Sequence, residues 1–262
     1  MNNAVISPSP VAERFPDRPQ QPAGAPPHID LPTDRPRIRE RTYQEGCRSF
    51  VLSRKLTAAL KGLSEQEHVD LCVTLLAAFK VLLARYSGQE DIVVATPIIA
   101  GSQGRTQEIA TLHSGTLPLR TNLCDNPTFR ELLWRVQEVC RTAYAQPDLQ
   151  AKILSVEPEA DSDLTHSPFY QVFFAMSNLP GRASNAAETS RDRVGLKPAA
   201  EGFELRLFVW ENEQELEGTL KYNANLFDAS TVERLLRHYE TLLGGVVVNP
   251  DQQIATLPLL ST

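Results

Sequence analysis

The stretch that most constrains the fold is LCVTLLAAFKVLLARYS, residues Leu71–Ser87. Its apolar side chains would lie on almost every side of a helix, and Gly88 directly after it is a typical helix end. A helix of this kind must be covered by other elements on most of its surface. No run of 18 apolar residues occurs in the sequence, so we expect a buried core helix and no membrane span.

The segments around this helix predict a mixed fold. Periodicity indicates strands near SFVLS, at Asp91–Ile98, Gly115–Leu123 and Phe169–Ser177, and a hairpin of FELRLFVWE and ELEGTLKYN with one solvated face. Further helices are predicted from a Ser53 cap to about His68, from an Asn126 cap with Pro127 in the first turn to about Ala145, and from an Asp228 cap to Val247. The pattern favours an α/β or α+β fold with a central sheet.

The N-terminal region differs in composition from the rest. Residues 1–27 contain seven prolines and few large apolar side chains, so burial cannot offset the entropy of ordering them. We interpret residues 1–27 as a flexible Pro-rich tail and residues 28–262 as the folded domain.

Charge and cysteine spacing argue against several classes of protein. A formal charge of -6 without clustered Lys and Arg argues against a nucleic-acid partner. The four cysteines have no CxxC spacing, which argues against a zinc site, and no apolar secretory segment precedes the domain. We therefore expect a cytoplasmic protein with no membrane partner.

One short motif suggests chemistry. His113 and Ser114 lie side by side before a predicted strand, but neighbouring strand residues point to opposite faces, so they are poorly placed as a base and nucleophile pair. No phosphate-binding glycine loop, nucleophile elbow or metal triad is present. We expect no catalytic, cofactor-binding or metal-binding residues.

Taken in order, several segments carry a family resemblance. LPTDRPR, LLAAFKVLLARYSGQEDIVVATPI, TLPLRTNL, NPTFRELLWRV, SPFYQVFF and LKYNANLFDASTVERLLRHYETLL together resemble the C-terminal half of a nonribosomal peptide synthetase condensation domain. The resemblance implies a single chloramphenicol acetyltransferase-like lobe, a two-layer sandwich of a mixed sheet and packed helices. Members join acyl or aminoacyl groups held on phosphopantetheine arms in a tunnel between two lobes.

The resemblance also indicates what this sequence lacks. The family's catalytic histidine belongs to an HHxxxDG motif in the other lobe, and this sequence has no HH pair. Segments that face the tunnel in the family are altered here: the family's GFFVNT stretch corresponds to Thr111–Thr116, which keeps only the threonine. The candidate tunnel-lining residues are His113, Ser114, Gly115, Thr116, Gln171 and Ser177.

These features lead to a functional expectation with alternatives. The first is a truncated, non-catalytic lobe that binds a peptidyl or acyl carrier protein, with its phosphopantetheine arm, or a synthetase module. The second is half of a split enzyme whose N-terminal lobe is a separate chain. A decayed fragment and an autonomous acyltransferase that uses His113 are the remaining alternatives.

Overall fold

The computed structural model describes residues 29–37, 43–97, 116–145, 171–177, 203–212 and 215–260. Within these ranges the elements run β1 (Glu45–Leu52), α1 (Arg54–Gln66), α2 (Leu71–Ser87), β2 (Asp91–Pro97), β3 (Thr116–Asn122), α3 (Phe129–Ala145), β4 (Val172–Ser177), β5 (Leu205–Asn212), β6 (Glu215–Asn223) and α6 (Ala229–Val248). The predicted tail, residues 1–27, lies outside the described residues.

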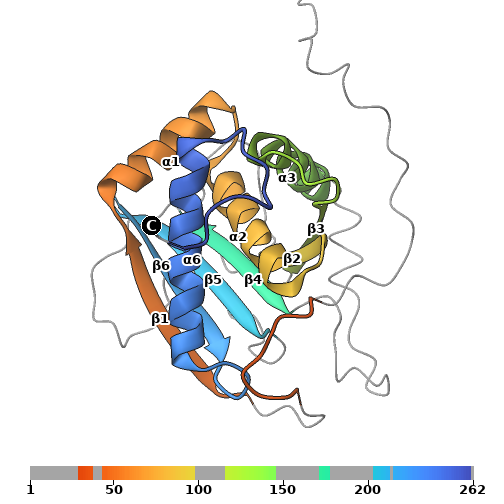
Figure 1. Cartoon of the computed structure of the whole chain (residues 1–262), viewed down its shortest axis with the longest axis vertical. Coiled ribbons are helices and arrows are strands. Elements are labelled where there is room, and N and C mark those ends of the chain that lie inside the picture. Colours follow the sequence, from red (N-terminus) through yellow and green to blue (C-terminus); the bar gives the residue numbers. More distant parts are fainter. Residues whose placement is uncertain are drawn as a thin grey trace, which may run out of the picture.

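The strands form one mixed six-stranded sheet in the order β1-β6-β5-β4-β2-β3. Its centre is parallel, because β4 pairs in parallel with both β2 and β5, whereas β1, β6 and β3 pair antiparallel with their neighbours. Figure 1 shows the helices on one side of this sheet, with α1, α2 and α6 in front of it and α3 beside β3. The architecture is therefore the predicted two-layer α/β arrangement.

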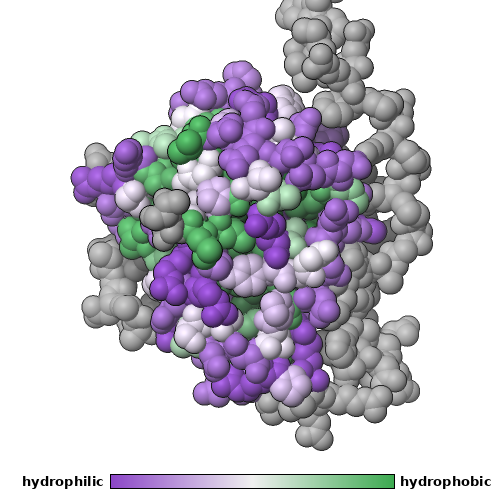
Figure 2. Space-filling view, in the orientation of Figure 1, coloured by the Kyte–Doolittle hydropathy of each residue, from purple (hydrophilic) through white to green (hydrophobic). Residues whose placement is uncertain are grey.

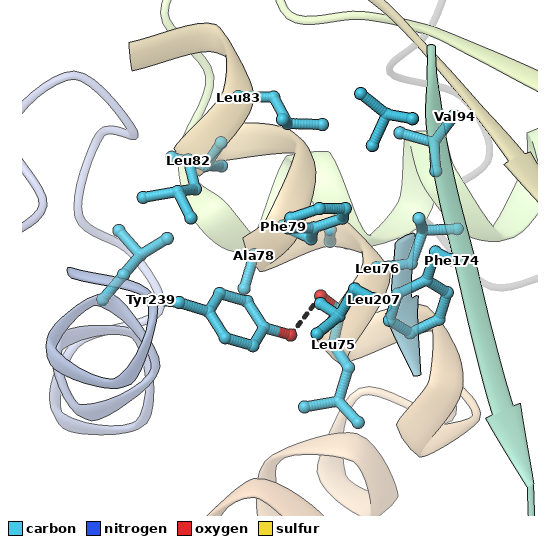
Figure 3. Close-up of a cluster of buried hydrophobic side chains, with 14 of the residues drawn as sticks. Leu75, Leu76, Ala78, Phe79, Leu82, Leu83, Val94, Phe174, Leu207 and Tyr239 are labelled. Carbon is cyan, nitrogen blue, oxygen red and sulfur yellow. Dashed lines mark hydrogen bonds between the residues drawn. The ribbon is translucent and has the colours of Figure 1, made fainter. Parts of the chain in front are cut away.

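The helix α2 occupies the centre of the helix layer. Its residues from Val73 to Leu83 are buried throughout, and α1, α3 and α6 pack around it. Figure 3 shows Phe79 directed toward Phe174 of the sheet, while Tyr239 of α6 reaches across to donate a hydrogen bond to the carbonyl oxygen of Leu75 at 2.9 Å. The prediction of a buried helix that ends at Gly88, which has a φ of 71°, is confirmed.

The outer surface of the helix layer is largely hydrophilic. Figure 2 shows hydrophobic residues gathered near the middle of this view, among α1, α2 and α6, with hydrophilic residues around them. Large apolar side chains that are exposed in the described part of the chain are Val51, Trp134, Val248 and Leu260. No helix of the described residues is both long and apolar enough to cross a membrane.

Of the caps predicted for α1 and α3, the first is confirmed and the second is not. Ser53 caps α1 as predicted, since its hydroxyl accepts a hydrogen bond from the Leu56 amide. The Asn126 cap is wrong: α3 starts later, where Thr128 and Glu131 accept hydrogen bonds from each other's backbone amides at 3.2 and 2.9 Å. This reciprocal arrangement is a capping box, and its T-x-x-E signature was present in the sequence.

The segment 29–37 supplies the cap of the last helix. Asp228 stands at the N-cap position of α6 but makes no side-chain capping bond there, and pairs with Arg35 instead. Asp34 supplies the carboxylate at this helix start instead, because it accepts hydrogen bonds from the Asp228 amide at 2.7 Å and from the Thr231 hydroxyl at 2.9 Å. A cap from a distant segment cannot be identified by local sequence spacing.

The predicted solvated face of the β5–β6 hairpin is also wrong. On the face turned away from the helices, Arg206, Phe208, Thr219 and Lys221 are all buried, at 5% exposure or less. Phe208 packs there with Phe173, Phe203, Ala95 and Ala175 in a second, smaller apolar cluster. We refer to this side of the sheet as the open face, since the described helices lie on the other side.

Candidate functional site

Three parallel strands terminate at the same end of the sheet. Because β2, β4 and β5 run in the same direction, their carboxyl ends, at Pro97, Ser177 and Asn212, lie at a common end of the sheet. Ligands in open α/β sheets commonly bind just beyond the carboxyl ends of such strands. This end is therefore the first candidate for a functional site.

Several described residues surround this end. Thr116, the first residue of β3, pairs with Pro97, and the hydroxyl of Tyr144 near the end of α3 donates to the Pro97 carbonyl oxygen at 3.2 Å. Burial raises the pKa of Tyr144 to about 12, so this hydroxyl stays protonated at neutral pH. Its arrangement is that of a structural donor that fixes α3 to β2.

An acidic side chain holds the hairpin at the same end. Glu217 of β6 accepts from the Trp210 indole nitrogen at 3.0 Å and from the Asn212 amide at 2.8 Å. Trp210 packs against the apolar cluster of the open face. Both carboxylate oxygens of Glu217 are thus used in orienting the end of β5.

The structure separates the predicted tunnel residues. Thr116 and Ser177 lie at the carboxyl end of the parallel strands, with β2 between their strands. Gln171 lies just before β4, about 20 Å from Ser177 along an extended chain of six residues. His113, Ser114 and Gly115 lie outside the described residues, so the lining of a tunnel stays a prediction.

Gln171 has a clear structural environment. Its side-chain oxygen accepts from the Ile29 amide at 2.7 Å, and its carbonyl oxygen accepts from the amides of Glu204 and Leu205. Glu204 in turn receives a bidentate pair of hydrogen bonds from Arg37 at 2.8 and 2.9 Å. Gln171 therefore joins the segment 29–37 to the start of β4 and β5.

The described residues contain little that resembles catalytic or metal chemistry. Within them, no group of three or more His, Cys, Asp or Glu side chains could hold a metal ion. His238 of α6 shares a 2.8 Å hydrogen bond with the Tyr86 hydroxyl, and burial lowers the pKa of His238. The backbone carbonyl of His68 accepts from Gln137, so both described histidines lie in the helix layer.

Sequence reasoning missed two groups of buried cations. Lys80 of α2 is fully buried, and Arg206 and Lys221 are buried on the open face. The sequence signal for Arg206 and Lys221 was that they alternate with apolar residues along their strands. We interpreted this alternation as a sign that both side chains are exposed to solvent. Alternation shows that two faces differ, but it does not show that the polar one is wet.

Comparison with known proteins identifies the family. The sequence model of the condensation domain matches residues 19–262. The chain belongs to the condensation-domain family. Among curated relatives, linear gramicidin synthase subunits C and B of Brevibacillus parabrevis are 40% and 41% identical over 240 and 246 residues. Each alignment covers 91% of this chain, but only 3% and 5% of the synthase subunits.

A solved structure has a similar fold. The complex of the X-domain and OxyB from teicoplanin biosynthesis contains a chain that is 26% identical, with a TM-score of 0.72. The alignment covers 92% of this chain and 53% of that chain. Our condensation-domain chain thus spans about half of this neighbour, and a few per cent of the synthase subunits.

Proposed function

We propose that these 262 residues form a condensation-domain lobe that does not form amide bonds alone and serves nonribosomal peptide synthesis by binding a carrier protein or a synthetase module. The observation that carries the proposal is a six-stranded sheet, covered by helices on one side in the described residues, in a sequence that contains no HHxxxDG motif. These 262 residues then do not supply the family's general base or positioning histidine. Retention of the scaffold without that group favours a binding function.

A structural neighbour supports partner binding. The X-domain from teicoplanin biosynthesis was solved in complex with OxyB, so a protein of similar fold is known to engage another protein. In our proposal residues 28–262 form the binding lobe and residues 1–27 act as a tether.

No cofactor is bound directly, and a phosphopantetheine arm arrives on the carrier. All four cysteines are unpaired, as in reducing compartments, and we place the chain in the cytoplasm.

A binding and turnover experiment tests this function. The purified chain is titrated with a carrier protein in its apo and phosphopantetheine-loaded forms and with a synthetase module, and binding is measured by calorimetry. Loaded donor and acceptor carriers are incubated with the chain in parallel, and peptide product is measured by mass spectrometry. We expect binding without product. Product formed by the chain alone, or an absence of binding to all three partners, contradicts the proposal.

The second candidate function is one half of a split condensation enzyme. The observation that fits it is that the alignment covers 53% of the X-domain chain, which leaves about half of that chain unmatched. In this proposal a separate N-terminal lobe supplies the HHxxxDG motif, and the pair forms amide or ester bonds between carrier-bound thioesters.

Reconstitution separates the two candidates. An N-terminal condensation lobe is expressed separately, mixed with this chain, and supplied with loaded carriers. Product that needs both chains, and disappears when the two histidines of the motif are replaced by Ala, supports the split enzyme. A stable two-chain complex that yields no product contradicts it.

A further inference from the structure

Two cations lie opposite each other on the open face of the sheet. Arg206 of β5 and Lys221 of β6 are direct cross-strand partners, and their side chains are only 5% and 6% exposed. Leu205 and Leu207 flank Arg206 and belong to the main core, so alternation directs Arg206 away from the helices. Like charges directly opposite each other on a sheet destabilise it unless an anion lies between them.

One carboxylate serves both cations. Glu45 of the edge strand β1 accepts from Arg206 Nη2 at 2.5 Å through one oxygen and from Lys221 Nζ at 3.1 Å through the other. Burial alone would raise the pKa of Glu45, but the hydrogen bond and charge of Lys221, together with those of Arg206, hold that pKa below its ordinary value. The cluster of Arg206, Lys221 and Glu45 therefore carries a net charge of one positive unit.

The guanidinium has further contacts but one unmatched donor. The Tyr43 hydroxyl contacts Arg206 Nη2, and the Tyr43 ring lies 5.6 Å from the guanidinium carbon. The Nε atom of Arg206 is buried and has no hydrogen-bond partner among the described residues. A buried charged donor without an acceptor costs more than an ordinary unmade hydrogen bond. A further anion would balance the remaining positive charge and accept a hydrogen bond from this donor.

The surroundings favour a strong interaction with such an anion. Phe208 lies two residues along β5 from Arg206 on the same face, and Phe173 packs on it with ring centroids 5.6 Å apart. Apolar neighbours lower the local dielectric constant and strengthen charge-assisted hydrogen bonds. The planar guanidinium presents adjacent N–H groups that match a two-oxygen anion.

We propose that the open face holds an oxyanion-binding subsite at β1, β5 and β6, in which Arg206 and Lys221 bind a carboxylate or phosphate group and Arg206 Nε is the donor that this group completes. Two sources offer this chemistry: the carboxylate of an acidic side chain and the phosphate of an ester such as a phosphopantetheine arm. The inference goes beyond the proposed function and does not depend on it, because it rests on the contacts of Arg206, Lys221 and Glu45 alone.

Thermal unfolding of the purified chain tests the subsite. The midpoint is measured against increasing sodium phosphate, sodium acetate or sodium chloride at matched ionic strength and pH 7. We expect a saturable rise with phosphate or acetate that chloride does not reproduce. A stronger response to phosphate identifies a phosphate source, and a stronger response to acetate identifies a carboxylate source. Equal responses to all three salts overturn the proposal.

Three variants make the test specific. Arg206→Gln should weaken the apparent Kd for the preferred oxyanion by about tenfold or more, the loss expected for one charge-assisted hydrogen bond. Glu45→Gln should strengthen the response, since it removes the competing carboxylate, whereas a purely structural Glu45 would only lower the midpoint. Arg54→Gln is the matched control, because Arg54 pairs with Glu215 at an exposed position and should leave the response unchanged.

Folding failures are covered by the same design. If Arg206→Gln does not fold, Glu45→Gln decides, and an unchanged or weaker response in that variant overturns the subsite. If Glu45→Gln folds only when the oxyanion is added, the oxyanion has replaced the missing carboxylate and the subsite is supported. If it folds in none of the three salts, the subsite is overturned.

Discussion

The ammonium group of Lys80 lies 2.5 Å from the carbonyl oxygen of Leu119 and 2.8 Å from the Thr121 hydroxyl, in the interior of the molecule. A third acceptor, the Ile92 carbonyl oxygen, lies at 3.5 Å. Lys80 thus joins the central helix α2 to the strands β2 and β3, with no carboxylate among these three acceptors.

The first prediction concerns the pH dependence of stability. Burial lowers the pKa of Lys80 from 10.5 to about 7, so above pH 7 the unfolded chain binds one more proton at this position than the folded chain. The free energy of unfolding should therefore rise between pH 7 and pH 9, by about 2 kcal/mol from this group. The window stops at pH 9, because the raised pKa of Cys72 acts in the opposite direction above it.

Lys80→Met is the variant that isolates this contribution. Urea unfolding of both proteins at pH 7, 8 and 9 gives the comparison, in which all other titrating groups are shared. We expect a smaller gain in stability with pH in the variant than in the native chain. The same pH dependence in both proteins would contradict a lowered Lys80 pKa.

The second prediction concerns the hydrogen bond between α6 and α2. Tyr239 is 1% exposed and packs edge-on against Phe79 with ring centroids 5.9 Å apart. Tyr239→Phe keeps the ring and removes the hydroxyl, so it should cost about 1 kcal/mol of unfolding free energy. Tyr239→Ala also leaves a cavity and should cost about 3 to 5 kcal/mol. Chemical denaturation that gives equal losses for both variants would show that the ring contributes little.

The third prediction concerns the start of α3. Thr128→Ala removes one half of the capping box and should destabilise the chain by about 1 kcal/mol. Thr142→Ala, near the end of the same helix at an exposed position, is the matched control and should change stability little. A larger loss in Thr142→Ala than in Thr128→Ala, measured by urea unfolding, would exclude the capping function.

The fourth prediction concerns a close approach between β6 and β1. A Cβ atom at Gly218 would lie 2.3 Å from Cζ of Phe50 and 2.9 Å from the carbonyl oxygen of Phe208. Gly218→Ala should therefore cost about 1 to 3 kcal/mol through displaced neighbours. Gly62→Ala meets no atom within 4 Å in α1 and should instead gain about 0.5 to 1 kcal/mol from helix propensity. Calorimetric midpoints that move in the same direction for both variants would refute this difference.

The sequence predicted helices and strands well where neighbouring residues determine them. The helix Leu71–Ser87 was predicted to the residue, because an apolar run, a following glycine and a strand of β-branched residues leave few alternatives. The β5–β6 hairpin followed from two alternating runs separated by a short polar turn. The cap of α3 was wrong because Asn126 and Thr128 are both good caps, and the choice depended on Asn126 accepting a hydrogen bond from the Ala255 amide.

Periodicity was enough to predict the buried central helix and a mixed fold with a central sheet, since it is a property of neighbouring residues. The family and the two-layer fold followed from the resemblance of the ordered segments to condensation domains. The environment of the charges, by contrast, depends on how distant segments pair. Glu45, Arg206 and Lys221 are far apart in the sequence, and only strand register brings them together. Burial then strengthens the effect of the one positive charge that Glu45 leaves unbalanced. Desolvated cations interact far more strongly with an anion than hydrated cations do.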